Sequence, residues 1–147
     1  MNGAGACYLL CWAATPYPGG KRPAHYLGYT NPEYGAEAGV LVMLRGVMGA
    51  DELTPAMAAG VLARDVEHQE GRGARLTAAV AAAGITWRHA RVWAGTTKDH
   101  ETWLKDLNDR RVLCAICNPG TRAGLTENIR PKRYRRGNAR AGLARIA

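Results

Sequence analysis

Apolar residues near the start of the chain form two short runs separated by a segment rich in proline and glycine. Residues 6–12 (ACYLLCW) and 25–29 (HYLGY) have the aliphatic and aromatic character of half-buried strands. Residues 14–23 hold three prolines and two glycines, which favour a loop. The pattern predicts a β-hairpin that carries Tyr8 on one strand and Tyr26 on the other. The ordinary role of such tyrosines is to anchor a core by their rings.

Two helices are predicted farther along the chain. Thr54 followed by Pro55 is typical of a helix start, because threonine caps the first turn and proline is tolerated there. Apolar residues then recur at helical spacing until Gly71, which favours a helix end. Residues 74–83 form a second, alanine-rich helix that is followed by Gly84.

The remaining segments complete an α/β (α+β) fold. Residues 85–93 alternate as expected for a third strand, and residues 96–109 form an amphipathic helix. The compact apolar run at residues 40–44 fits either a buried strand or a helix, and we favour a helix over 37–48. The predicted order is β–β–(α)–α–α–β–α, a small three-stranded antiparallel sheet flanked by helices.

Length and charge divide the chain into one domain and an extension. The 147 residues suffice for one core, and no window approaches the roughly 18 apolar residues of a membrane span. Residues 1–119 carry 12 Lys/Arg and 11 Asp/Glu, whereas residues 120–147 carry 8 Lys/Arg and one acid. We therefore assign 1–119 to the folded domain and 120–147 to a basic C-terminal extension that is too poor in large apolar residues to form a core.

A segment this basic most often contacts a polyanion, chiefly nucleic acid. The alternative is an extension that only increases solubility. The cationic side chains expected to contact nucleic acid lie near the end of the first helix and in the extension: Arg72, Arg75, Arg130, Lys132, Arg133, Arg135 and Arg136.

Four cysteines and no recognisable signal peptide predict a reducing, cytoplasmic setting. Cys114 and Cys117 have the spacing of half a zinc knuckle. Cys7 and Cys11 lie four residues apart on a predicted strand, so about 13 Å separates them. Because two ligands of one tetrahedral zinc cannot be that far apart, zinc is not expected. One strand cysteine together with a histidine is the arrangement that would still complete a site.

Three polar side chains on the predicted helices are candidates for chemistry. Arg64 and His68 are four residues apart and therefore share one helix face. Glu101 lies in the first turns of the last helix, four residues before Lys105. Each has an ordinary explanation as well: a solvated arginine, a surface imidazole and an i,i+4 ion pair.

Six of these residues follow one another in an order that resembles the GIY-YIG endonuclease family, in particular its compact bacterial branch. They are Tyr8, Tyr26, Arg64, His68, Glu101 and Asn118. The surrounding motifs are Cys7-Tyr8-Leu9-Leu10, His25-Tyr26-Leu27-Gly28, the run Arg64–Gly73 with Ala74-Arg75-Leu76, Gly84-Ile85-Thr86-Trp87 with Ala90-Arg91-Val92-Trp93, and Leu113-Cys114 with Cys117-Asn118-Pro119.

The resemblance covers about residues 6–30 and 60–119. Ala6-Cys7-Tyr8 stands where the family name has Gly-Ile-Tyr, with the tyrosine kept. Residues 31–58 form an insertion before the helix that carries Arg64, and the basic extension lies outside the resemblance.

The resemblance implies a divalent-metal-dependent DNA endonuclease that hydrolyses phosphodiester bonds on duplex or branched DNA. The implied cofactor is Mg²⁺ or Mn²⁺ held by Glu101, and the implied location is the cytoplasm, at the nucleoid. The implied roles are these: Tyr8 or His68 as general base, Tyr26 to orient the water, Arg64 to stabilise the phosphate, and Asn118 to brace the site.

Two other functions are open. The first is a nucleic-acid-binding or complex-docking protein on the same fold without turnover, with a protein partner bound through residues 31–58 or the extension. The second is a small interaction module stabilised by zinc.

If residues 120–147 follow the DNA backbone, deleting them should weaken binding in a salt-dependent way. The slope of log K against log salt is about −0.9 per phosphate neutralised, so we expect the slope to change by about 3–5. Cleavage at saturating DNA should hardly change, because no predicted catalytic residue lies in the deleted segment. Fluorescence anisotropy over a salt series measures the slope, and an unchanged slope would assign the extension another purpose.

Overall fold

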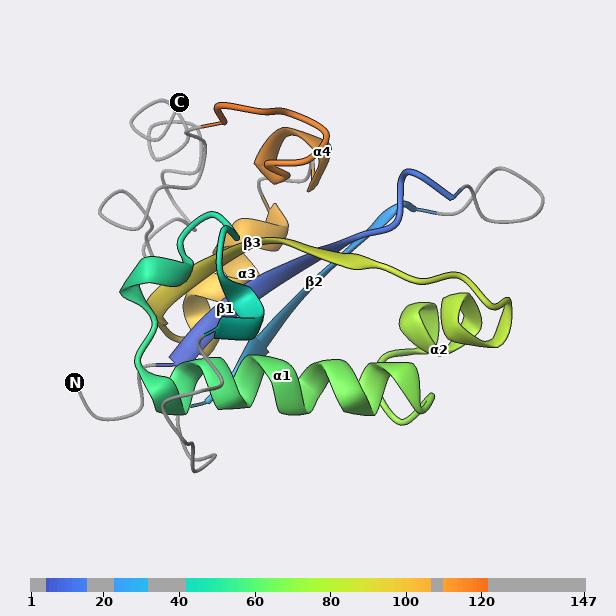
Figure 1. The fold of residues 1–147 in the computed structure, drawn as a ribbon, viewed down its shortest axis with the longest axis horizontal. Coiled ribbons are helices and arrows are strands. Elements are labelled where there is room, and N and C mark those ends of the chain that lie inside the picture. Colours follow the sequence, from blue (N-terminus) through green and yellow to red (C-terminus); the bar gives the residue numbers. More distant parts are fainter. Residues whose placement is uncertain (1–4, 16–22, 32–41, 107–109, 122–147) are drawn as a thin grey trace.

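The computed structural model describes residues 5–15, 23–31, 42–106 and 110–121. The basic extension beyond residue 121, with its five predicted DNA contacts, therefore lies outside the described residues. The strands are β1 (Gly5–Cys11), β2 (His25–Thr30) and β3 (Arg88–Thr96). They form one antiparallel sheet in the order β2-β1-β3 (Figure 1). This confirms the predicted hairpin and the α+β class with a three-stranded sheet.

The central strand β1 is buried along its whole length, which explains its unbroken apolar sequence. Because side chains alternate across a strand, β1 divides its residues between two cores. Tyr8 and Leu10 belong to the core on one face, whereas Leu9 and Cys11 belong to the core on the other.

The helices α1 (Pro55–Gln69) and α2 (Arg75–Ala82) cover the face that carries Tyr8 (Figure 1). The predicted cap is confirmed, because the backbone N–H of Met57 donates to Thr54 Oγ1 at 3.2 Å. Both helices also begin and end within about two residues of the predicted positions.

The opposite face is covered by α3 (Lys98–Asp106) and the single turn α4 (Arg110–Leu113). Figure 1 shows α1 and α4 on opposite sides of the sheet. Trp103, Leu104 and Leu113 supply the apolar side chains of this second core. The sequence pattern predicted one helix to residue 109, but α3 ends at Asp106 and α4 follows as a separate turn.

The third strand begins three residues later than predicted. Its first residue, Arg88, pairs with Cys11 at the end of β1, so residues 85–87 have no residue of β1 beside them. Ile85 instead packs into the core under α2. The alternating apolar and polar residues at 85–87 therefore reflect burial against the core and not pairing with a strand.

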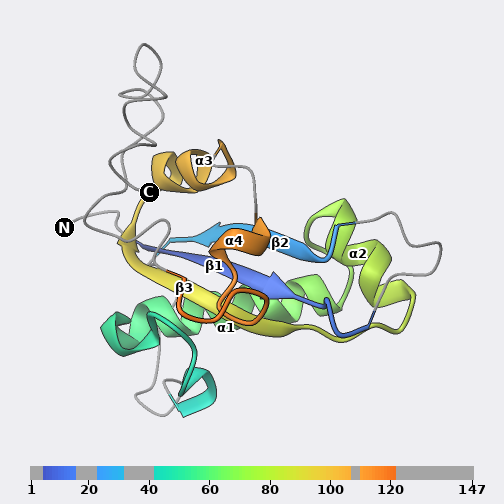
Figure 2. The same cartoon turned by 90° about the horizontal axis from the view of Figure 1, so that it is seen from above.

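Residues 42–48 of the insertion are not α-helical, so the predicted helix over 37–48 is wrong there; residues 37–41 lie outside the described residues. Residues 42–44 form a 3₁₀ turn, followed by the 3₁₀ helix η2 (Ala50–Glu52). The carbonyl of Met48 accepts a hydrogen bond from Val92 N at 2.9 Å, so this segment lies along the open edge of β3 (Figure 2). Covering an edge in this way protects its unpaired backbone groups.

No helix among the described residues is long and apolar enough to cross a membrane.

Gly49→Ala should destabilise the fold more than Gly46→Ala. Both glycines have positive φ, 87° and 85°, so each substitution carries the same backbone penalty of about 1 kcal/mol. A Cβ at Gly49 would overlap Val92 O, whereas nothing lies within 4 Å of a Cβ at Gly46. Urea unfolding of the two variants measures the difference, and equal losses would show that the segment does not dock on β3 in solution.

Candidate functional site

Tyr8, Tyr26 and His68 form one cluster between the sheet and α1. The ring centroids of Tyr8 and Tyr26 lie 6.3 Å apart, and the Tyr26 ring meets the His68 ring edge-on at 4.9 Å. The Tyr8 hydroxyl lies 2.8 Å from His68 Nε2. Tyr8 is 2% and His68 is 3% exposed, so their polar atoms meet away from bulk water.

Thr77 on α2 gives this hydrogen bond its direction. Thr77 Oγ1 donates its one proton to the carbonyl of Ala74 at 3.0 Å and lies 2.8 Å from His68 Nδ1. Since Thr77 can then only accept from the ring, we assign the ring proton to Nδ1. His68 Nε2 is left as the acceptor for the Tyr8 hydroxyl proton. The chain Tyr8–His68–Thr77 is therefore arranged to carry a proton away from Tyr8.

Two glycines make room for this cluster. Gly28 is the cross-strand partner of Tyr8, and a Cβ at Gly28 would come within 2.5 Å of the Tyr8 hydroxyl oxygen. A Cβ at Gly73 would overlap the His68 ring. Any side chain at these positions would force a tyrosine or the histidine to move.

Burial controls the protonation of both hydrogen-bonded partners. Burial raises the pKa of Tyr8 above its usual range, with a smaller opposite effect from Arg64. Burial also lowers the pKa of His68. At neutral pH the resting pair is thus a neutral phenol donating to a neutral imidazole, and Tyr8 is not a phenolate.

Arg64 lies one turn before His68 on α1 and retains hydrogen-bonding capacity. Its positive charge acts on Tyr8, Tyr26 and His68, which places it beside the cluster. Nη1 donates to Glu67 at a long 3.4 Å, and Nε is buried with no hydrogen-bond partner in the part of the chain that the structure describes. A guanidinium has five N–H donors, so most of them remain for an anionic ligand.

Glu101 lies on α3, the helix that covers the other face of the sheet from α1, and its charge raises the pKa of Tyr26 and of Tyr8. The residue is 4% exposed, and its carboxylate oxygens lie 2.9 Å from Lys98 Nζ and 3.0 Å from Lys105 Nζ. The ordinary i,i+4 pair that the sequence allowed is therefore present, with a second lysine added. A divalent cation at Glu101 would compete with these two ammonium groups for the carboxylate oxygens.

A groove of about 680 Å³ opens beside Tyr26. Its cationic lining residues are Lys105, Arg110 and Arg111, from α3 and α4. A groove with three cations around one tyrosine suits a polyanionic ligand such as a sugar-phosphate backbone.

The other predicted site residues lie elsewhere. Asn118 follows α4, where its side chain donates to the carbonyl of Val112 at 2.9 Å and so braces that loop. Arg72 is exposed and paired with Glu70, and Arg75 is exposed at the start of α2.

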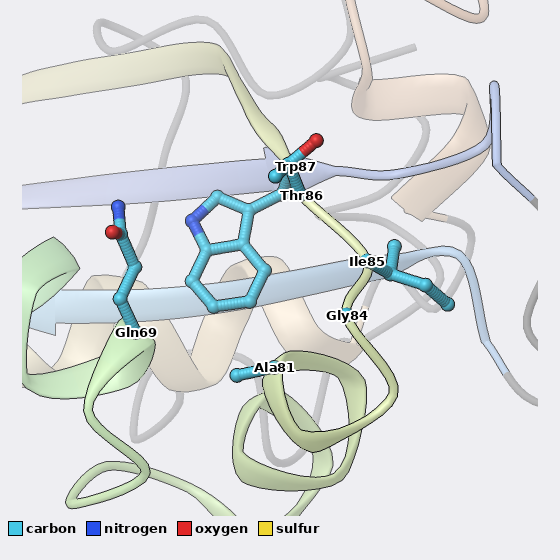
Figure 3. A pocket seen from close by; sticks show the side chains of 6 residues that line it. All are labelled: Gln69, Ala81, Gly84, Ile85, Thr86 and Trp87. Atoms are coloured by element: carbon cyan, nitrogen blue, oxygen red, sulfur yellow. The ribbon is translucent and has the colours of Figure 1, made fainter.

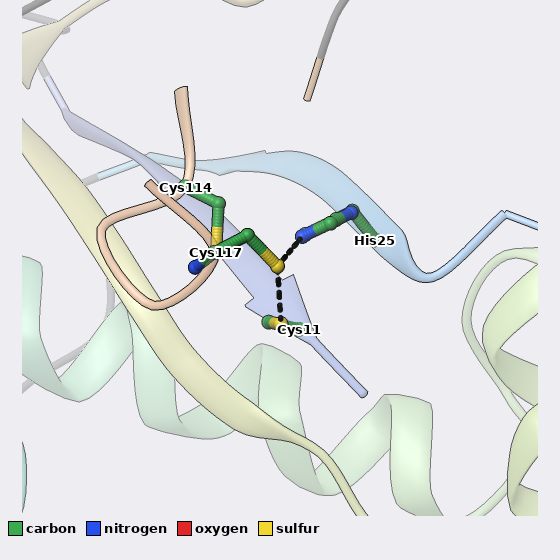
Figure 4. A group of neighbouring side chains, drawn as sticks. All are labelled: Cys11, His25, Cys114 and Cys117. Atoms are coloured by element: carbon green, nitrogen blue, oxygen red, sulfur yellow. Dashed lines mark hydrogen bonds between the residues drawn. The ribbon is translucent and has the colours of Figure 1, made fainter. Parts of the chain in front are cut away.

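A second polar cluster lies on the other face of the sheet and corrects the expectation about zinc. Its members are Cys11, His25, Cys114 and Cys117, whose ligand atoms all lie within 4.8 Å of one another. Figure 4 shows the four side chains pointing toward one another from the ends of β1 and β2 and from the loop after α4. The expectation of Mg²⁺ or Mn²⁺ as the cofactor, with zinc not expected, is wrong, because this set of donors is the kind that holds zinc.

The pairing of β1 with β2 explains why the sequence did not predict a zinc site. Cys7 and Cys11 indeed lie too far apart to share a metal, and Cys7 instead contacts Thr96. The cluster needs only Cys11, because the register of β1 and β2 places His25 directly opposite it. Deriving that register from the hairpin would have identified the fourth ligand.

A further pocket of about 400 Å³ lies between α1, α2 and the start of β3 (Figure 3). Its lining residues are Gln69, Ala81, Gly84, Ile85, Thr86 and Trp87. Trp87 Nε1 donates to Asp65 at 2.6 Å, so the one indole N–H here is already satisfied. None of these six side chains is titratable, and Thr86 carries the one hydroxyl among them.

No family model matches the sequence, and no curated protein or solved structure matches it either.

His68 should make stability fall as the pH decreases. Its pKa in the folded state lies below the value of about 6.5 of the unfolded chain, so stability is complete above pH 6.5 and is lost as the pH falls toward the folded-state pKa. His68→Gln should flatten this dependence. His89 and His100, whose pKa values burial also lowers, should account for the remainder. Unfolding curves between pH 5 and pH 8 test this, and an unchanged pH dependence in the variant would contradict the buried neutral imidazole.

Proposed function

We propose that the protein is a divalent-metal-dependent endonuclease of the GIY-YIG type that hydrolyses DNA phosphodiester bonds. The observation that carries the proposal is the Tyr8–His68–Thr77 hydrogen-bond chain, with Tyr26 and Arg64 beside it. A core tyrosine needs no such chain, because one backbone carbonyl would satisfy its hydroxyl.

The chain supports a general-base role for Tyr8. As Tyr8 takes a proton from the attacking water, its own proton passes to His68 Nε2, so no free phenolate has to form. The resulting imidazolium keeps its Nδ1–H on Thr77. In this relay Tyr8 gains a proton from the water as it gives its own to His68, so the raised pKa of the buried phenol does not oppose the reaction. The positive charge forms on the imidazole. Tyr26, which lines the groove, would orient the water.

Arg64 is the proposed phosphate ligand. Its guanidinium is permanently charged and presents its donors in a fixed fork, which fits a non-bridging phosphate oxygen. Negative charge accumulates on these oxygens in the transition state, so a fixed cation beside them lowers the barrier.

Glu101 would hold the divalent cation, which when bound would neutralise charge on the phosphate and the leaving oxygen. Lys98 and Lys105 now occupy both carboxylate oxygens, and their side chains are 77% and 40% exposed. Exposed lysines can move away at little cost, so binding of substrate and cation would replace them.

The groove defines how DNA would approach. Its cationic lining residues lie on the side of α3 and α4, next to Tyr26. A phosphate backbone placed along them would bring one phosphodiester to the tyrosine. The proposed setting is the cytoplasm, at the nucleoid, where the basic extension would add contacts to the backbone.

A second candidate is a DNA-binding protein without turnover. The observation that favours it is the pairing of Glu101 with two lysines, which already balances the charge of the carboxylate without a metal ion. This protein would bind through the same basic groove but leave the DNA intact, so the assay that follows separates the two candidates.

Tyr8→Phe should reduce the cleavage rate by about 100-fold or more, because it removes only the hydroxyl that would relay the proton. Arg64→Ala and Glu101→Ala should abolish cleavage while DNA binding stays nearly intact. The assay uses linear, nicked and branched DNA with one added divalent salt at a time. Omitting the salt is preferable to a chelator, which would also strip the cysteine cluster.

Tyr29→Phe is the matched control, since Tyr29 lies on the same strand as Tyr26 but packs on the opposite face. It should cut DNA at the wild-type rate. Full activity of Tyr8→Phe or Arg64→Ala would show that the assigned site is wrong. DNA binding without cleavage under every salt would favour the second candidate.

A further inference from the structure

We propose that Cys11, His25, Cys114 and Cys117 bind one Zn²⁺ ion as a structural tetrahedral site. The site joins the N-terminal hairpin to the loop after α4, segments that are about a hundred residues apart in the sequence. The inference does not depend on the proposed function, because metal content and folding are measured without nucleic acid.

The spacing of the donor atoms matches a tetrahedral zinc site. With Zn–S bonds of about 2.3 Å and Zn–N bonds of about 2.0–2.1 Å, neighbouring donors should lie about 3.8 Å apart for two sulfurs and about 3.5 Å for sulfur and nitrogen. Cys11 Sγ and Cys117 Sγ lie 3.8 Å apart, and Cys117 Sγ lies 3.4 Å from His25 Nε2 (Figure 4). A disulfide would need about 2.05 Å between sulfurs.

The loop around Cys114 has the internal hydrogen bonding that a zinc site requires. The backbone N–H of Cys117 donates to Cys114 Sγ at 3.3 Å, which stabilises negative charge on that sulfur. Asn118 N donates to Cys114 O at 2.9 Å, closing the turn that brings both cysteines to the same side. Asn118, predicted to brace a catalytic site, thus braces the metal loop.

The charge of the site is also balanced by the fold. Three thiolates and one Zn²⁺ leave a net charge of −1. Arg91 on β3 is 2% exposed, and its Nη1 donates to the carbonyl of Leu113, the residue before Cys114, at 3.2 Å. A buried guanidinium at this place offsets the negative charge of the metal centre.

Closed sites with four protein ligands are structural, whereas catalytic zinc keeps an open position. Three of the four ligands are buried and all four positions are filled by protein. The ion would therefore hold α4, with Arg110 and Arg111, against the ends of β1 and β2. It would fix the basic side of the groove rather than react there.

The test is metal analysis of the full chain, purified without chelator from cells grown with zinc. We expect elemental mass spectrometry to find one zinc ion per chain. Stripping it should lower Tm by more than about 10 °C, and added zinc should restore Tm. Cobalt(II) added to the stripped protein should give the intense visible absorption of a tetrahedral centre and the near-ultraviolet bands of thiolate ligands.

Cys117→Ser should lose the metal and the cobalt bands, whereas Cys7→Ser is the matched control. Cys7 is also a buried free cysteine, but it lies outside the cluster, so its variant should keep one zinc. If Cys117→Ser fails to fold, the cobalt spectrum of the wild-type chain still decides. Wild-type protein that takes up neither zinc nor tetrahedral cobalt, a Cys11–Cys117 disulfide without metal, or loss of zinc in Cys7→Ser would overturn the proposal.

Discussion

The antiparallel register between β1 and β2 determines where both polar clusters lie. It sets Tyr8 opposite Gly28 on one face of the sheet and Cys11 opposite His25 on the other. Because side chains alternate along a strand, a slip of β2 by one residue would move both Gly28 and His25 to the wrong face. The buried apolar residues of β1 oppose such a slip, since both faces of the strand are packed.

The two clusters satisfy their buried polar groups in different ways. A polar group buried without a partner costs roughly 1–3 kcal/mol, so groups inside a core have to be paired. On the α1 side, Tyr8, His68 and Thr77 satisfy one another in a directed chain of hydrogen bonds. On the α4 side the donors are mainly thiols, which are weak hydrogen-bonding groups, and a metal ion would satisfy them far better.

The groove beside Tyr26 lies where these two arrangements meet. His25 and Tyr26 are consecutive residues of β2 and both line it, although they point to opposite faces of the sheet. The helices on the α4 side supply the cations of the groove, whereas α1 supplies His68 and Arg64 behind the tyrosine. A change in either cluster would therefore alter the position of residues that line the groove.

The amino-acid sequence by itself determined the hairpin, the capped helix α1 and the three-stranded α+β class, because these follow from local periodicity and turn chemistry. It also gave Tyr8, Tyr26, Arg64 and His68 as candidate site residues, and the structure brings them together on the α1 side of the sheet. Only tertiary structure decided the 3₁₀ docking of the insertion on β3 and the grouping of Cys11 and His25 with Cys114 and Cys117. Those depend on which segments lie side by side, and local sequence patterns carry no information about such contacts between distant segments.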